Sequence, residues 1–258
     1  MATVKELMSL EGRVSVVTGG ATGLGLQMAG ALAEAGSHVV ICSRKLENCE
    51  EAAQAIGKLG VQTLAIGCDV TKADQVEAMK DATLKKFGRV DVLVNNAGRA
   101  WVAPPEEMPL ERWQQVLDLN ITAPFLCSQV LGREMIKARR GKIINIASIA
   151  GLVGRNPKAY NSIAYGTSKG ALVNFTRDLA VKWAQHNIQV NAICPGFFVT
   201  SINEKMYEKN RESIDREIPL GHTGGPDDLK GIAVLLASDA SNFMTGAIIP
   251  VDGGSTAW

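Results

Sequence analysis

The sequence predicts an α/β protein built on a parallel sheet, and three observations support this prediction. Apolar runs rich in Val and Ile alternate with amphipathic helical segments along the whole chain. These runs are continuous, as is typical of strands that are covered on both faces. With 258 residues, 46% of them hydrophobic, the chain is long enough to bury a large core. Repeated strand–helix units imply right-handed crossovers with helices on both faces of one sheet.

Seven apolar runs are predicted to be strands, and the six longer segments between them are predicted to be helices. The expected strands lie at 13–19, 38–43, 61–68, 90–98, 141–148, 188–196 and 246–254. The expected helices lie at 23–36, 46–59, 72–87, 111–138, 163–185 and 227–238. The helical segments before Gly36, Gly60 and Gly88 are each followed directly by a residue suited to a left-handed helix end.

The pattern predicts a single nucleotide-binding domain over 1–258, since neither a linker nor an internal repeat interrupts it. Its one long irregular region lies at about 196–225, between the sixth strand and the last helix. Long connections in a regular α/β domain are commonly binding loops, so we expect this region to border the substrate.

Composition and charge exclude several classes of protein. The 27 Lys and Arg residues nearly balance 26 Asp and Glu residues, so a nucleic-acid partner is not expected. No run approaches the roughly 20 apolar residues of a membrane span, and residues 1–13 do not resemble a secretory signal. Five scattered cysteines and three histidines show no zinc-ligand spacing, so we expect no metal, reduced thiols and a cytoplasmic protein.

A glycine-rich turn joins the first strand to the first helix. Gly19, Gly23 and Gly25 follow Thr18 in the pattern G-x-x-x-G-x-G, with Thr22 among them. Glycines at these positions allow a tight turn and let the backbone approach a pyrophosphate at the helix N-terminus. The turn therefore predicts a dinucleotide site.

The end of the second strand predicts which dinucleotide is bound. An acidic residue there would accept hydrogen bonds from the ribose hydroxyls of NAD, whereas a cation would bind the 2′-phosphate of NADP. This chain has Ser43, Arg44 and Lys45 at the strand end, and Glu47 follows shortly after. We therefore expect NADP(H), with NAD(H) as the alternative.

Three residues suggest carbonyl chemistry. Ser148 ends the fifth strand, and Tyr165 and Lys169 are four residues apart, on one face of a predicted helix. An ammonium near a phenol is expected to lower the phenol pKa, so that Tyr165 can give and take a proton. Ser148 can donate a hydrogen bond to a carbonyl oxygen on which negative charge develops.

The ordered motifs resemble those of the short-chain dehydrogenase/reductase family over almost the whole chain, from about Leu10 to Gly254. They are Thr18-Gly19-x-x-x-Gly23-x-Gly25, Asn95-Asn96-Ala97-Gly98, Asn120, Ser148, Tyr165-x-x-x-Lys169 and Pro195-Gly196-x-x-x-Thr200. Within the family, 3-oxoacyl-(acyl carrier protein) reductases and gluconate 5-dehydrogenases look most similar. The resemblance implies a Rossmann fold with strand order 3-2-1-4-5-6-7 and a homotetramer.

The resemblance also implies roles for individual residues. Tyr165 would be the general acid/base, Lys169 its partner and a ligand of the nicotinamide ribose, and Asn120 the holder of a water that links Lys169 to solvent. The implied cofactor contacts are Gly19, Thr22, Gly23, Leu24, Gly25, Ser43, Arg44, Lys45, Asp69, Val70, Asn96, Ala97, Gly98, Tyr165, Lys169, Pro195, Gly196, Phe198 and Thr200. The expected substrate contacts are Ser148, Trp101, Tyr160, Phe197 and Phe198.

Three functions remain open from the sequence. The first is an NADPH-dependent reductase of 3-oxoacyl-like or related ketones, acting on a small-molecule substrate. The second is a polyol or sugar-acid dehydrogenase of the gluconate type. For either enzyme, Arg99 or Arg155 could meet a carboxylate or phosphate, as in an acidic sugar or a carrier-bound acyl chain. The third is a catalytically silent nucleotide-binding protein, which predicts loss of at least one of Ser148, Tyr165 and Lys169. All three residues are present.

Overall fold

A computed structural model describes residues 1–154, 161–200 and 203–257. In these ranges the chain forms one seven-stranded sheet in the order β3-β2-β1-β4-β5-β6-β7, and every neighbouring pair is parallel. The predicted fold class and strand order are confirmed. The strands are β1 Val14–Thr18, β2 His38–Ser43, β3 Thr63–Gly67, β4 Val92–Asn95, β5 Gly141–Ile146, β6 Ile188–Pro195 and β7 Ile248–Val251.

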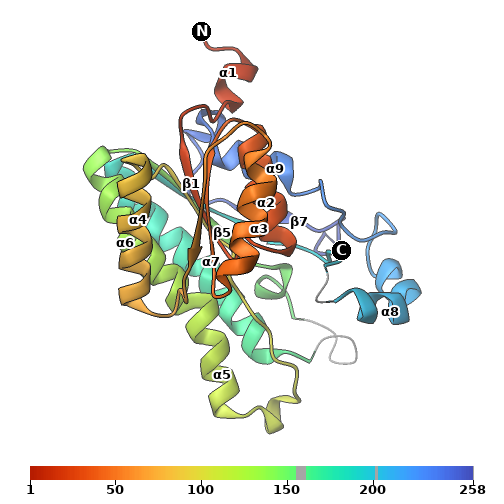
Figure 1. Cartoon of the computed structure of the whole chain (residues 1–258). Coiled ribbons are helices and arrows are strands. Elements are labelled where there is room, and N and C mark those ends of the chain that lie inside the picture. Colours follow the sequence, from red (N-terminus) through yellow and green to blue (C-terminus); the bar gives the residue numbers. More distant parts are fainter. Residues whose placement is uncertain (155–160, 201–202, 258) are drawn as a thin grey trace.

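Helices cover both faces of the sheet (Figure 1). One layer contains α2 Gly23–Glu34, α3 Leu46–Gly57 and α9 Lys230–Ala237, and the other contains α4 Ala73–Phe87, α6 Ala123–Ala138 and α7 Ile163–Trp183. The helices outside these layers are α1 Val4–Met8, α5 Leu110–Leu117 and α8 Glu204–Arg216. Short turns complete the chain: η1 Pro105–Glu107, η2 Asp118–Thr122, η3 Ile149–Gly151, η4 Ala184–His186 and η5 Asp239–Ser241.

The core consists of a hydrophobic layer on each face of the sheet. In β1, Val17 packs toward α2 and α3, whereas its neighbour Val16 packs toward the α4 and α6 side. Ile144 and Ile143 divide between the same two layers in β5. Because successive strand residues face opposite ways, burial on both faces requires an uninterrupted apolar run. This requirement explains why the strands could be recognised in the sequence.

Two expectations about the helices are wrong in detail. The segment 111–138 is not one helix, because the π-helical turn η2 divides it into α5 and α6. The region 196–225 is not irregular throughout, because it contains α8. That helix is strongly polar and buries only Ile214, so it lacks the broad apolar face that marks a packed helix in a sequence.

Within the described ranges, no helix is both long enough and apolar enough to cross a membrane.

Candidate active site

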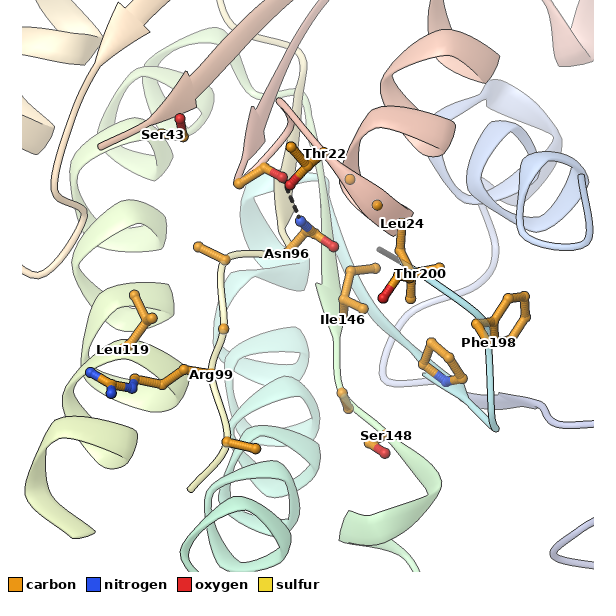
Figure 2. A pocket seen from close by; sticks show the side chains of 18 of the residues that line it. Thr22, Leu24, Ser43, Asn96, Arg99, Leu119, Ile146, Ser148, Phe198 and Thr200 are labelled. Carbon is orange, nitrogen blue, oxygen red and sulfur yellow. Dashed lines mark hydrogen bonds between the residues drawn. The ribbon is translucent and has the colours of Figure 1, made fainter. Parts of the chain in front are cut away.

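A cavity of about 570 Å³ lies at the carboxyl ends of the central strands. Figure 2 shows it with Ser43 toward one end and Ser148 toward the other. It is lined by every predicted cofactor residue except Lys45, namely Gly19, Thr22, Gly23, Leu24, Gly25, Ser43, Arg44, Asp69, Val70, Asn96, Ala97, Gly98, Tyr165, Lys169, Pro195, Gly196, Phe198 and Thr200.

The glycine turn between β1 and α2 forms one wall of this cavity. Gly19 and Gly23 have φ angles of 62° and 54°, a conformation that side chains other than glycine rarely adopt. A Cβ atom on Gly25 would lie 2.3 Å from the Gly19 carbonyl oxygen and 2.4 Å from the Asn96 amide nitrogen. Only glycine therefore fits at position 25.

Asn96, at the end of β4, holds the glycine turn in place. Its side-chain amide donates to the carbonyl oxygens of Thr18 and Gly19, at 3.0 and 3.1 Å. The Thr18 hydroxyl accepts from the backbone N–H groups of Asn96 and Ala97. Thr18, which is absent from the predicted contacts, therefore ties the two loops together from the side of β1.

The N-terminus of α2 is suited to an anion. Thr22 is the N-cap residue, but its side chain makes no capping hydrogen bond, and the first turn contains no acidic residue. The first N–H groups of a helix lack partners within the helix, and its dipole favours negative charge there. Together with the close-fitting glycines, this helix end matches a pyrophosphate.

The end of β2 brings one cationic side chain, that of Arg44, to the far end of the cavity. Arg44 is exposed there, while Lys45 lies outside the lining as the N-cap residue of α3. Asp69 also lines this end, and its carboxylate accepts from the backbone N–H and hydroxyl of Thr71. Burial acts to raise the pKa of Asp69, but Thr71 and the Arg44 cation outweigh it and lower the pKa.

Ser148, Tyr165 and Lys169 line the opposite end of the cavity. Ser148 follows β5 and caps η3, accepting from the Ala150 N–H at 3.1 Å. Tyr165 and Lys169 project from α7. The Lys169 ammonium lies 5.6 Å from the centroid of the Tyr165 ring and donates to the Ile146 carbonyl at 2.7 Å.

Burial dominates the ionisation of this group. It raises the pKa of the Tyr165 phenol, although a hydrogen bond with Ser148 acts in the opposite direction. Burial also lowers the pKa of Lys169 to about 8. The expected lowering of the phenol pKa by Lys169 is therefore not found in the protein alone, where the ammonium donates to a backbone carbonyl.

Asn120 lies in the π-helical turn η2 and is completely buried. Its side chain accepts from the Arg99 N–H and donates to the Arg99 carbonyl and the Ser168 hydroxyl, each at 2.9 Å. A Cβ atom on Gly98 would lie 3.3 Å from the Asn120 oxygen and 3.6 Å from the Lys169 nitrogen. Asn120 and Lys169 therefore both approach Gly98, and the water between them stays a prediction.

The expected substrate residues are not all brought together. Phe197 and Phe198 line the cavity, and the Phe197 ring lies 5.9 Å from Tyr207 of α8. Trp101 is not part of the lining, because its ring lies beneath the Arg112 guanidinium at 4.4 Å. Tyr160 lies outside the described residues, as does Arg155.

Eight lining residues are absent from the predicted lists of cofactor and substrate contacts. They are Cys42, Cys68, Arg99, Ala100, Leu119, Ile146, Ala147 and Asn203. Ile146 and Ala147 directly precede Ser148, so that adjacency could have identified them. Asn203 lies in the region 196–225 that we expect to border the substrate, and its side chain accepts from the Thr200 N–H at 2.7 Å and thereby orders this part of the wall.

The model of the short chain dehydrogenase family matches residues 13–211. The chain belongs to the short-chain dehydrogenase family. An NAD-dependent glycerol dehydrogenase of Listeria innocua is 37% identical over 95% of this chain and 94% of its own. A 3-oxoacyl-[acyl-carrier-protein] reductase of Thermotoga maritima is 38% identical over 96% of this chain and 99% of its own. The gluconate 5-dehydrogenase of Burkholderia cenocepacia, solved with NADP and tartrate, is 33% identical with a TM-score of 0.93, covering 99% of this chain and all of that one.

This short-chain dehydrogenase is thus an oxidoreductase that acts on CH–OH or C=O groups with NAD(H) or NADP(H). The residues present fit such a nucleotide, because the cavity extends from the uncapped N-terminus of α2, which is suited to an anion, to Ser148, Tyr165 and Lys169. When bound, the nucleotide supplies a carbon that gives or takes a hydride. Among the described residues, no group of three or more His, Cys, Asp or Glu could hold a metal ion.

Proposed function

We propose that the chain is an NADPH-dependent reductase that converts a ketone of the 3-oxoacyl or a related type to a secondary alcohol. The observation that carries the choice of cofactor is Arg44, which lines the far end of the cavity where β2 ends. β2 itself ends in Ser43 and provides no carboxylate for ribose hydroxyls. The nearest lining carboxylate, Asp69, already accepts two hydrogen bonds from Thr71.

The ionisation of the catalytic group fits a proton donor to a carbonyl oxygen. A raised pKa keeps the Tyr165 phenol protonated at neutral pH, which is the form that donates a proton to a carbonyl oxygen. In this proposal Ser148 hydrogen-bonds the same oxygen as negative charge develops on it. Lys169 provides positive charge beside the phenol and holds the nucleotide ribose, and Asn120 positions the proton path behind Lys169.

Calorimetric titration with NADPH and with NADH tests the choice of cofactor. A charge-assisted hydrogen bond contributes about 1.5–3 kcal/mol, so Arg44 should favour NADPH by roughly ten- to a hundredfold. Arg44→Asp should abolish this preference. Lys58→Asp is the matched control, because it makes the same charge change at the distant end of α3. Equal affinity of wild type for both nucleotides would refute the proposed role of Arg44.

A polyol or sugar-acid dehydrogenase is the second candidate, and the glycerol and gluconate dehydrogenases among the relatives favour it. Figure 2 shows the Arg99 guanidinium pointing away from Ser148, so this residue gives no support for a substrate carboxylate. Assays of 3-oxoacyl thioesters against glycerol, tetritols and gluconate, each with both nucleotides, separate the two candidates. Turnover of polyols without turnover of 3-oxoacyl thioesters would refute the proposed reductase function.

We also propose that residues 1–258 act as one nucleotide-binding domain, and that the protein is a cytoplasmic homotetramer. The continuous sheet and the five free, buried cysteines are consistent with these proposals. Light scattering of the purified protein tests the tetramer, and a monomeric mass would reject it.

A further inference from the structure

A second cavity, of about 280 Å³, lies at the opposite edge of the sheet, beside the amino ends of β5 and β6. It shares no lining residue with the nucleotide cavity. All of its lining side chains are polar: Arg140, Lys142, Asn187, Gln189, Asp239 and Asn242.

Lys142 is the central feature of this cavity. It is the second residue of β5 and is only 4% exposed. Its ammonium donates to the Ser241 hydroxyl at 3.2 Å and to the Asn242 side-chain oxygen at 2.9 Å, and both of these acceptors are uncharged. Lysine is almost never buried to this degree without a partner of opposite charge.

The one carboxylate in the cavity wall is already engaged by arginines. Asp239 lies 2.5 Å from the buried Arg13 guanidinium and 3.6 Å from that of Arg140. Three cations therefore lie near a single carboxylate, which pairs with the two arginines and not with Lys142. Burial lowers the pKa of Lys142 to about 8; Asp239 opposes this change, whereas Arg13 and Arg140 reinforce it. The local charge is thus favourable for a further anion.

We infer that this cavity binds a small oxyanion of the phosphate class, held by Lys142 and Arg140. A phosphate group carries a charge of about −1.5 to −2 at neutral pH and has three acceptor oxygens, which matches the excess positive charge. Lys142 has a third proton to donate, and the Arg140 guanidinium, about half exposed, can form a forked contact with such an oxyanion. The cavity has room for a phosphate group and a small attached group.

Oxyanion binding in this cavity does not depend on the proposed reductase function, so either proposal can be refuted while the other holds. Inorganic phosphate is the probe, titrated calorimetrically into the full chain after loading with one equivalent of nicotinamide nucleotide. That loading keeps phosphate out of the α2 helix end. Ionic strength is held constant with chloride, because screening alone changes the stability of any charged protein.

One phosphate should bind to each chain. Lys142→Met should weaken this binding by about tenfold or more, as expected for loss of a charge-assisted hydrogen bond. Arg140→Gln should also weaken it, and it serves as the deciding variant if Lys142→Met does not fold. Lys137→Met is the control, because Lys137 is exposed and pairs with Glu134, and it should leave binding unchanged.

Two further titrations distinguish the source of the oxyanion. Tighter binding of glycerol 3-phosphate than of inorganic phosphate would indicate a phosphorylated metabolite, whereas equal binding would indicate free phosphate. Three results would overturn the inference. They are no phosphate binding by the wild type, equal phosphate binding by the wild type and both cavity variants, or a heat from a chloride titration equal to the heat from the phosphate titration.

Discussion

Gly25→Ala should separate nucleotide binding from the rest of the fold. The added methyl carbon would lie 2.3 Å from the Gly19 carbonyl oxygen and 2.4 Å from the Asn96 amide nitrogen, where ordinary contacts are 3.4–4 Å. The turn must therefore move by about 1 Å, and overpacking of this kind costs about 1–3 kcal/mol. The movement also displaces the N–H groups of the turn and helix end that would hold a pyrophosphate. Loss of one or two charge-assisted hydrogen bonds should weaken nucleotide binding by at least about tenfold.

Gly30→Ala is the matched control on the same helix. No atom lies within 4 Å of its hypothetical Cβ, so alanine should stabilise α2 by about 0.5–1 kcal/mol and leave affinity unchanged. Calorimetric titration measures binding, and scanning calorimetry should show a melting temperature lowered by about 2–10 °C for Gly25→Ala. Nucleotide affinity in Gly25→Ala equal to that in Gly30→Ala would refute the reasoning.

Three more predictions concern the buried catalytic group. Tyr165→Phe should lower kcat by about 10²–10⁴-fold with little change in nucleotide affinity, measured by steady-state kinetics and titration; retained turnover would reject Tyr165 as the acid. Burial lowers the pKa of Lys169 from 10.5 to about 8, so the folded protein loses this proton before the unfolded chain does. The unfolding free energy of wild type should therefore rise by about 2 kcal/mol between pH 7 and 10 relative to Lys169→Met in urea titrations, and parallel pH curves would contradict this. Asn120→Leu should lower the free energy of unfolding by at least about 2 kcal/mol, because the Arg99 backbone and Ser168 lose their buried partner. An unchanged midpoint of urea unfolding would contradict this prediction.

The sheet was predictable from the sequence because its energetic requirement is simple. The five inner strands are buried on both faces, so each must be an uninterrupted apolar run. The edge strands β3 and β7 are only partly buried, but they also lie in apolar runs, and all seven runs are strands. The π-helical turn at Asn120 was not predictable in the same way. It adds a single residue to a helical turn, and hydrophobic periodicity does not register so small a change. The turn nevertheless places Asn120 where it can hold the Arg99 backbone.

The two ends of the nucleotide cavity were predictable to different degrees. The glycine turn and the Tyr165–Lys169 pair follow from local spacing, since backbone conformation and helical geometry restrict the residues allowed. The substrate side depends on tertiary packing. Trp101 follows β4 closely enough to suggest a pocket residue, but its ring stacks with Arg112 instead. Phe198 does reach the cavity, with its ring against Gly224, a contact that no local spacing indicates.

The position of the site follows from the connectivity of the sheet. The strand order reverses between β1 and β4, so the connections that leave these neighbouring strands diverge and open a crevice at their carboxyl ends. Such a crevice is stable only if the two diverging loops are held together. The hydrogen bonds from Asn96 to Thr18 and Gly19 do this, joining segments 77 and 78 residues apart at the base of the crevice. We therefore expect Asn96 to affect nucleotide binding through the turn that it holds. Removing its amide should widen the crevice and weaken binding even though Gly25 is intact.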